Sequence, residues 1–221
     1  YMEGNLDGYS VNYTEPAFVF AIMAIAATRP VIDLAGSMIG FVAKLLPLSN
    51  GVSFFLVALI LGPLLGSFIT EPAAMTVTAL ILKRRYYDQG MTKKFMYATI
   101  GVLFVNISVG GTLTHFAAPP VLMVAHTWDW DMVHMARHFG WKSAVGVVVN
   151  AVALTAMFKG ELQNMDGEAE AQTEERRPAP AWLVAIHVIF MALVVFNAHH
   201  MVVFLGLFLF FLGIVDVTME H

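Results

Sequence analysis

The chain has 221 residues, of which 58% are hydrophobic and only 13% are charged, and its mean hydropathy is +0.72. A soluble domain carries roughly a quarter charged residues, so the composition excludes a soluble protein and predicts an all-α polytopic membrane protein. The net charge of −4, with basic residues confined to short loops, excludes a nucleic-acid partner, and the lack of cysteine excludes disulfides and thiolate chemistry.

The first segment, residues 1–15, is polar and rich in turn-forming residues, and we expect a loop or a frayed end there. An apolar run follows over residues 16–46, interrupted by Arg29-Pro30, and it predicts one long kinked or tilted span. Arg29 and Asp33 are one helical turn apart and are expected to pair. The pair either serves a function at membrane depth or lies at the interface, where Asp33 merely neutralises Arg29.

The stretch 52–82 is apolar for about 31 residues except for a break at residues 67–72, which reads SFITEP. One helix of that length would be about 46 Å long, well beyond a hydrocarbon core of about 30 Å. Two half-length helices joined at Thr70-Glu71-Pro72 fit better, which predicts a re-entrant hairpin. Pro72 suits the first position of the returning helix, and Glu71 suits its N-cap.

A basic loop, residues 83–94 (KRRYYDQGMTKK), follows the hairpin. Loops rich in Lys and Arg face the cytoplasm, so we expect this loop and the mouth of the hairpin on that side. The next apolar segment, residues 95–125, is broken by Gly110-Gly111 and by Pro119-Pro120, which predicts a discontinuous helix. Paired broken helices are typical of a transporter's binding site, because a break at membrane depth must be buried or line a cavity.

The segments after this helix have fewer sequence features that indicate a function. Residues 126–139 mix tryptophans, acids and histidines, which favours an amphipathic helix lying at the interface, and residues 140–158 read as a plain span. Residues 159–180 form an acidic polar linker, and we expect two further spans within 181–221. The transport half would thus cover residues 16–158. The chain starts without methionine and stops just after an apolar run, so we expect it to be part of a longer protein.

Polar side chains gather at the two breaks, and they are Ser67, Thr70, Glu71, Asn106, Ser108, Thr112, Thr114 and His115. Hydroxyl, amide and carbonyl oxygens suit sodium or a similar hard cation. Glu71 is the only acid in either break, and a proton and a cation compete for a poorly solvated carboxylate. Histidine has a reference pKa of about 6.5, so His115 is expected to relay or gate the proton. The alternative is that these hydroxyls only bond neighbouring helices.

The two breaks together resemble the ion transporter superfamily, which includes sodium/proton antiporters, arsenite pumps and citrate or dicarboxylate carriers. The resemblance covers about residues 16–160 and is closest to the sodium/proton antiporter branches. The residues that carry it are Thr70, Glu71 and Pro72 at the tip, and Asn106, Gly110, Gly111, Thr112 and Thr114 before Pro119-Pro120. It implies secondary active exchange of sodium, or a similar cation, for protons, with no cofactor.

The resemblance also implies one half of an inverted-repeat transporter, embedded in a lipid bilayer that we expect to be a bacterial inner membrane. No second hairpin with a broken helix follows residue 180, so the missing second half is expected elsewhere in the same chain. Family members commonly dimerise, which implies a homodimer. The Thr-Glu-Pro tip and the sequence His115-Phe116-Ala117-Ala118 depart from the pattern of relatives, and they leave the transported ion open.

Two other functions stay open, and neither is an enzyme. Half-helix N-termini suit anions, which favours sodium- or proton-coupled transport of a carboxylate or an arsenite-like anion. The histidines favour a non-transporting subunit that binds haem or a metal, and the candidates are His134, His138, His187, His199 and His200. Adjacent histidines point in different directions and no CxxCH occurs, so we expect no metal site.

Overall fold

A computed structural model describes residues 2–5, 8–11, 13–115, 117–118, 121, 124–125, 127–165, 179–197 and 200–218. Within these ranges the chain is almost wholly helical, apart from two short strands, β1 (Met2–Asn5) and β2 (Gly8–Val11). The strands pair antiparallel with Met2 opposite Val11. The expected loop over residues 1–15 is therefore wrong, because strands of four residues are too short to show an alternating pattern.

The apolar run 16–46 forms two helices, α1 (Thr14–Ala26) and α2 (Arg29–Ala43), which are bent by 68°. The kink predicted at Arg29-Pro30 is therefore present as a sharp bend between two helices. Pro30 has no N–H and its ring collides with the carbonyl four residues earlier, that of Ala26, so α1 ends there. Thr28 is extended, and its hydroxyl donates to the carbonyl of Ile25 at 2.7 Å, which satisfies one of the acceptors that α1 leaves free.

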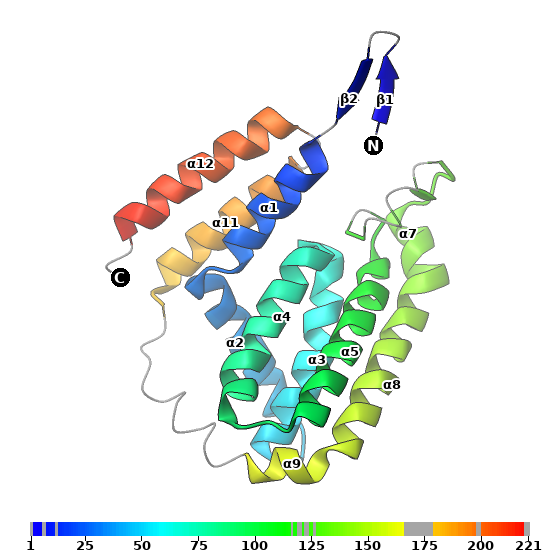
Figure 1. Cartoon of the computed structure of the whole chain (residues 1–221), viewed down its shortest axis with the longest axis vertical. Helices are drawn as coiled ribbons and strands as arrows, with labels where there is room; N and C mark the ends of the chain where they lie inside the picture. The colour runs from blue at the N-terminus through cyan, green and yellow to red at the C-terminus, as the bar shows by residue number, and fades with distance from the viewer. Residues whose placement is uncertain are drawn as a thin grey trace.

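The stretch 52–82 forms two helices joined at the predicted position, α3 (Asn50–Ile69) and α4 (Glu71–Arg85), with Thr70 between them. The predicted half length holds only for α4, because α3 has 20 residues and is long enough to cross a membrane. They run antiparallel and pack closely (Figure 1). A Cβ placed on Gly66 would lie 3.2 Å from Cβ of Ala74, and one on Gly62 would overlap the side chain of Thr78. The two glycines of α3 therefore let the arms of the hairpin approach each other.

The discontinuous helix begins with α5 (Lys93–Gly110), after the short turn η1 (Tyr87–Gln89). The Thr92 hydroxyl caps α5 by accepting from the N–H of Phe95 at 3.3 Å. α5 ends at the predicted Gly110-Gly111, and the 3₁₀ turn η2 (Gly111–Leu113) follows. Pro119 and Pro120, predicted to open the second half-helix, lie outside the described residues, as does Phe116.

After the break, the chain returns as one long apolar helix, Met132–Met157. It consists of α7 (Met132–Met135), the π-helical turn η3 (Ala136–Gly140) and α8 (Trp141–Met157). Residues 132–139 of the segment expected to lie at the interface are helical, and they continue directly into α8. Met135 is buried there, and Gly140 lies against Leu113, so packing on the break outweighs the polar composition.

The remaining described helices are α9 (Lys159–Asn164), α11 (Ala181–Phe196) and α12 (Met201–Thr218). α9 occupies the start of the predicted linker 159–180, because Leu162 is fully buried and fixes that turn against the bundle. Residues 166–178 of the linker lie outside the described residues. α11 and α12 coincide with the two predicted spans, and they pack beside α1 (Figure 1).

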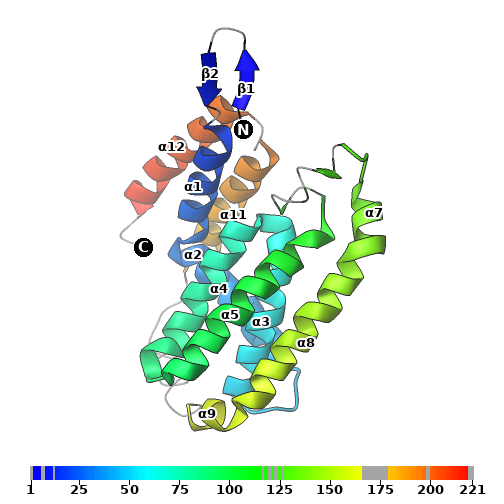
Figure 2. The ribbon, with the colours of Figure 1, turned by 45° about the vertical axis from the view of Figure 1, so that its right-hand side comes forward.

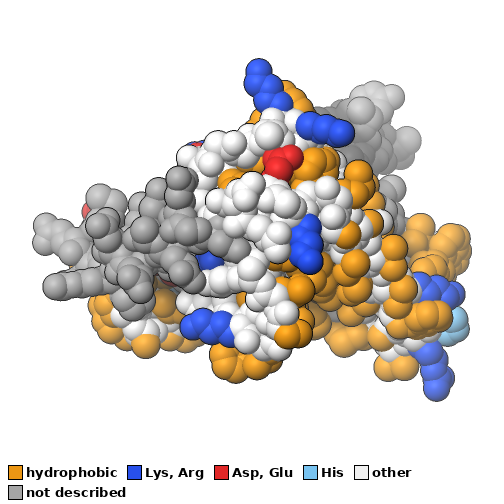
Figure 3. Space-filling view, turned by 90° about the horizontal axis from the view of Figure 1, so that it is seen from below, with side chains coloured by type: hydrophobic (Ala, Val, Ile, Leu, Met, Phe, Trp, Pro, Cys, Tyr) orange, Lys and Arg blue, Asp and Glu red, His pale blue; other side chains and the backbone are white. Residues whose placement is uncertain are grey.

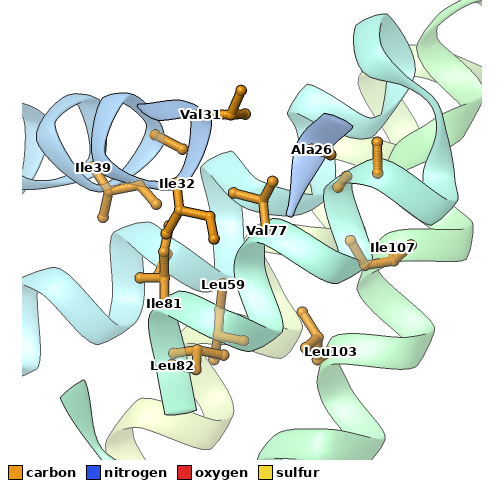
Figure 4. Close-up of a cluster of buried hydrophobic side chains, with 14 of the residues drawn as sticks. Ala26, Val31, Ile32, Ile39, Leu59, Val77, Ile81, Leu82, Leu103 and Ile107 are labelled. Carbon is orange, nitrogen blue, oxygen red and sulfur yellow. The ribbon is translucent and has the colours of Figure 1, made fainter. Parts of the chain in front are cut away.

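The packed core is formed mainly by the helices from α1 to α5, and it surrounds the hairpin α3–α4. Figure 4 shows Leu59, Val77, Leu103 and neighbouring aliphatic side chains in this cluster. Aromatic rings close its lower end: Phe95 stacks on Phe158 with ring centroids 4.5 Å apart, and the Tyr86 hydroxyl donates to the Gly51 carbonyl at 2.6 Å. These contacts fix the base of the hairpin, so the position of its tip is set by rigid elements.

Candidate functional site

The turn at the hairpin tip is held by Thr70 in an unusual backbone conformation. Its φ of 81° and ψ of 151° lie in a region that β-branched residues rarely enter, at a cost of about 1–3 kcal/mol. Thr70 occupies the N-cap position, so the expectation that Glu71 is the N-cap is wrong. Glu71 is the first residue of α4 and Pro72 the second, since the reversal is completed at Thr70.

The Thr70 side chain is buried with 5% exposure, and its hydroxyl has no hydrogen-bond partner among the described residues. A buried hydroxyl without a partner is unfavourable by about 1–3 kcal/mol. Strain and an unpaired polar atom therefore coincide at a single residue of the tip. Such sites are typical of places where a ligand supplies the missing contact.

Glu71 lies directly against the break in α5. A Cβ placed on Gly111 would be 2.7 Å from Oε1 and 2.8 Å from Cγ of Glu71. The half-buried carboxyl group therefore occupies the space that Gly111 leaves by lacking a side chain. The structure thus brings together the acid of the first interruption and the paired glycines of the second.

Gly110 brings α5 onto the hairpin one residue earlier. A Cβ on Gly110 would be 2.8 Å from the carbonyl carbon and oxygen of Pro63 in α3. Backbone atoms cannot move aside as a flexible side chain can, so this position also requires glycine. The two glycines have different neighbours: Gly110 faces backbone, and Gly111 faces the Glu71 carboxyl.

Ser67 ties the hairpin to the break through its side chain and its carbonyl. Its hydroxyl donates to the carbonyl of Gly110 at 2.6 Å and accepts from the N–H of Leu113 at 3.1 Å. Its own carbonyl accepts from the Thr114 hydroxyl at 2.6 Å. These bonds satisfy backbone groups that the broken helix leaves free. Ser67 and Thr114 therefore hold the register between the tip and the break.

Thr112 connects the break to α8. Its hydroxyl donates to the carbonyl of Val109 at 2.8 Å and also contacts the hydroxyl of Ser143. The sequence shows residues 140–158 only as a plain span, so Ser143 was not predicted. Ser143 and Asn150 lie seven residues apart on one face of α8, and this polar stripe in an apolar segment is the signal that could have found them.

Asn106 is fully buried and joins three helices. Its Nδ2 donates to the carbonyls of Leu59 (3.1 Å) and Val147 (3.2 Å), and its Oδ1 accepts from Asn150 at 3.1 Å. The Leu59 carbonyl needs a donor because Pro63, four residues later, has no N–H. Asn106 thus binds α5 to α3 and α8, and the structure does not place it in contact with Glu71.

The two remaining residues of the predicted site, His115 and Ser108, lie in different surroundings. His115 follows Thr114 in the break and is partly buried, and its role as a proton relay stays a prediction. Ser108 lies on the exposed side of α5, although it is only two residues from Asn106. The structure therefore does not bring Ser108 to the tip, since a helix turns by about 200° over two residues.

The predicted pairing of Arg29 with Asp33 is confirmed. Arg29 Nε lies 3.4 Å from Asp33 Oδ2, and Arg84 Nη1 of α4 lies 3.8 Å from Asp33 Oδ1. The side chain of Arg29 is 54% exposed and that of Asp33 is 31% exposed. Arg84 is near the far end of α4 from Glu71, so this cluster is separate from the tip. Asp33 is thus paired with two bases at a partly exposed position.

The histidines lie on different elements. His134 and His138 stack at the upper end of the 132–157 helix, whereas His187 is buried in α11 against Phe211. His200 precedes α12, and His199 lies outside the described residues. Among the described residues, no three acidic or histidine side chains are arranged to hold one metal ion.

Helix lengths fit a bilayer. Four described helices are long and apolar enough to cross a membrane, and the bent pair α1–α2 adds a fifth if it forms one span. Large apolar side chains such as Phe41 (69%), Phe196 (83%) and Val202 (86%) face outward. Together with two interrupted helices that meet at a carboxyl group, these features define a helical integral membrane protein of the transport class.

Comparison with known protein families supports this class of protein. The chain belongs to the family described as "Putative Na+/H+ antiporter", whose sequence pattern matches residues 6–221. This confirms the resemblance to antiporters that the two breaks indicated. The protein is accordingly a membrane transporter rather than an enzyme, and in the broad sense a cation/proton transporter. No curated protein and no solved structure matches the chain.

Proposed function

We propose that the protein exchanges sodium, or a similar monovalent cation, for protons, and that Glu71 is the group for which the two ions compete. The observation that carries this proposal is the contact between Glu71 and Gly111, which joins the hairpin tip to the break in α5. A carboxylate held among apolar half-helices retains its proton until a cation replaces it. Alternation between the two occupants is the minimum chemistry of antiport.

The chemistry of the tip supports a hard cation. Next to Glu71, the unpaired hydroxyl of Thr70 offers an oxygen ligand that no described residue uses. Thr112 and Thr114 belong to the same break as Gly111, which lies against Glu71, and we propose that they and the backbone of the break complete the binding shell. The N-terminus of α4 already carries the Glu71 side chain, so negative charge at the tip disfavours the alternative of an anion as the transported species.

The depth of the tip supports a re-entrant hairpin. Gly140 lies against Leu113, so it marks the level of the break on the long helix 132–157. At 1.5 Å per residue, about 26 Å of helix runs from Gly140 to Met157 and about 12 Å from Gly140 to Met132. The whole helix, about 39 Å long, exceeds a hydrocarbon core of about 30 Å, so its first turns can extend into the interface. We propose that the break and the tip lie inside the bilayer toward its upper side, and in Figure 1 the tip is below the upper ends of α1 and α7.

The distribution of charge supports an orientation with the hairpin base in the cytoplasm. Figure 3 shows Lys and Arg side chains on the lower face of the molecule. The exposed bases at the lower ends of the helices are Lys44, Lys83, Arg84, Lys93, Lys94 and Lys159. Basic residues flanking membrane helices favour the cytoplasmic side, so we propose that loop 83–94 is cytoplasmic.

The helices packed around the tip support the proposal that the hairpin and the broken helix form one structural unit, of which the protein has two. α5 and α8 lie side by side in Figures 1 and 2, and Asn106 and Ser67 bind them to α3. We propose that this hairpin and broken helix form one half of an inverted-repeat transporter, that a second half belongs to the same protein, and that the transporter works as a homodimer. Alternating access at a repeat interface is the mechanism that such halves serve.

The test of antiport uses proteoliposomes that contain a pH-sensitive dye. Addition of sodium or lithium should release protons from the wild-type vesicles, and Glu71→Gln should abolish the response because an amide cannot exchange a proton. Asp33→Asn is the matched control: it removes another acid of an interrupted helix pair, and it should leave exchange intact. Equal exchange by wild type and Glu71→Gln would refute the proposal.

A further inference from the structure

A stacked column of rings stands at the upper end of the helix 132–157, outside the proposed transport site. The rings of His134 and His138 are nearly parallel, with centroids 4.2 Å apart and an angle of 23°. Trp130 also stacks on His134 at 5.3 Å and 14°. The two imidazoles are thus oriented side by side one helical turn apart, which is the spacing that places two ligands on one helix face.

The tautomer of His138 follows from its hydrogen bond. Its Nδ1 lies 3.0 Å from the carbonyl oxygen of His134, and a carbonyl can only accept, so Nδ1 carries the proton. Nε2 therefore presents a lone pair, and the side chain of His138 is exposed. A ring N–H bonded to a backbone carbonyl with the other nitrogen free is the arrangement found around metal-binding histidines.

His134 is held from its other side. Its backbone N–H donates to Oδ1 of Asp131 at 2.7 Å, which caps the start of α7, and its ring is stacked on Trp130 and His138. Both imidazoles therefore lie on one helix face and close together, although each ring must turn out of the stack before its nitrogen lone pair, which lies in the ring plane, can point at a shared ion.

We propose that His134 and His138 together bind one borderline divalent transition-metal ion of the zinc type. Imidazole nitrogens suit Zn²⁺, Ni²⁺ and Cu²⁺, and two histidines one turn apart on a helix are a known way to hold zinc. A modest rotation of the rings brings the two nitrogens onto one ion, and water fills its remaining positions because the pair faces outward. Two protein ligands make this an exchangeable site rather than a structural one.

The other histidines show what distinguishes this pair. His187 makes the same bond, from Nδ1 to the carbonyl of Leu183 at 2.8 Å, but it is buried against Phe211. His200 is exposed, but it is not stacked on another described histidine. Only the pair in α7 and η3 combines a free nitrogen, exposure and a second imidazole, within the part of the chain that the structure describes.

The site is joined to the break by direct contacts. His138 lies in the π-helical turn that ends at Gly140, and Gly140 packs against Leu113. A metal ion that bridges His134 and His138 would clamp α7 to this turn. If the proposed antiport is correct, the bound ion should slow exchange by stiffening one wall of the break, but the binding itself does not depend on that function.

Calorimetric titration of the protein in lipid nanodiscs, with no oligohistidine tag, tests the proposal. Zn²⁺ should bind wild type with a stoichiometry of one ion per chain. His134→Ala and His138→Ala should each lose this binding at Zn²⁺ concentrations that saturate wild type, whereas the matched control His200→Ala should retain it. Equal Zn²⁺ binding by wild type and the His134→Ala/His138→Ala double variant would overturn the proposal.

Fluorescence gives a second measurement that places the ion. Cu²⁺ quenches a nearby indole, so it should quench wild-type tryptophan emission, and the His134→Ala/His138→Ala double variant should lose this quenching. Trp182→Phe, which changes the tryptophan of α11, should leave the quenching unchanged. Quenching that persists in full in the double variant would place the ion elsewhere and contradict the assignment.

Discussion

Two helix pairs in this chain are interrupted next to a proline, and they differ in almost every other respect. α1 and α2 bend by 68° at a break before Pro30, whereas α3 and α4 reverse completely before Pro72. Thr28 at the first break has an ordinary extended backbone (φ −69°, ψ 147°), whereas Thr70 at the second has φ 81°.

The polar groups at the two breaks also have different partners. The Thr28 hydroxyl is bonded to its own helix, and the nearby Asp33 is paired with Arg29 and Arg84 at a partly exposed position. The Thr70 hydroxyl has no partner among the described residues, and Glu71 lies against the break of another helix. A proline that interrupts a helix therefore does not by itself mark a site. The meeting of two breaks around an acid does.

The largest expected effect comes from Gly111→Ala. The new methyl group would displace the Glu71 carboxyl group, which lies 2.7 Å from its position, so we expect cation/proton exchange to fall to near background. A flexible side chain can move aside, so stability should fall by no more than about 1–3 kcal/mol. Exchange in proteoliposomes and thermal unfolding in detergent measure the two effects.

Gly101→Ala is the matched control, because nothing lies within 4 Å of a methyl group on this exposed residue of α5. It should keep exchange and gain up to about 1 kcal/mol from helix propensity. If both variants transport normally, Glu71 does not need its place beside Gly111.

Ser67→Ala should have the next largest effect, and on stability. It removes the partner of two backbone groups, the Gly110 carbonyl and the Leu113 N–H, and each unpaired buried group costs about 1–3 kcal/mol. We expect the free energy of unfolding to fall by about 3 kcal/mol. Ser37→Ala, whose exposed hydroxyl only bonds its own helix at Asp33, should change it by less than about 0.5 kcal/mol. Equal losses would mean that Ser67 does not hold the break.

Thr70→Gly and Thr28→Gly should act in opposite directions. Glycine relieves the strained backbone at the tip, so Thr70→Gly should raise the unfolding free energy by about 1 kcal/mol while it weakens cation affinity by removing a ligand. Thr28→Gly should lower the unfolding free energy by about 1 kcal/mol, because the backbone of Thr28 is unstrained and glycine only adds freedom to the unfolded chain. Chemical denaturation of both variants compares them, and the same sign of change in both would contradict the assigned strain.

The smallest effect is expected from Arg84→Gln. Its contact with Asp33 is 3.8 Å long and partly exposed, and exposed ion pairs contribute at most about 1 kcal/mol. The loss should vanish in about 1 M salt, where charges are screened over about 3 Å. Thermal unfolding at low and high salt measures it. A large, salt-independent loss would show that this break also holds a functional charge.

The features predicted from sequence are those that local chemistry determines. The turn at Thr70, the end of α5 at Gly110 and the pairing of Arg29 with Asp33 all depend on residues within one or two helical turns. The position of the bend between α1 and α2 was also predicted, because a proline interrupts a helix locally. Its angle of 68° could not be predicted, because it depends on how the two helices pack.

The features that could not be predicted depend on partners distant in sequence. Asn106 was expected to bind an ion, but its amide is taken by the Leu59 carbonyl, which Pro63 frees in another helix. Ser143 and Asn150 share one face of α8, but which helix that face meets was known only once Thr112 was placed beside Ser143. The position of Glu71 against Gly111 was only partly foreseen, because the sequence predicts two breaks but not the register that Ser67 imposes between them.

The bonds of Ser67 also have a consequence for biosynthesis. Ser67 and its partner Gly110 are separated by 43 residues, so at about 5–20 residues per second the ribosome needs about 2–9 s to add the second after the first. During that interval the polar groups of the hairpin tip lack the helix that will pair with them. The bonds between Ser67 and the break can therefore form only after α5 has been made, which makes the order of synthesis part of how this site is assembled.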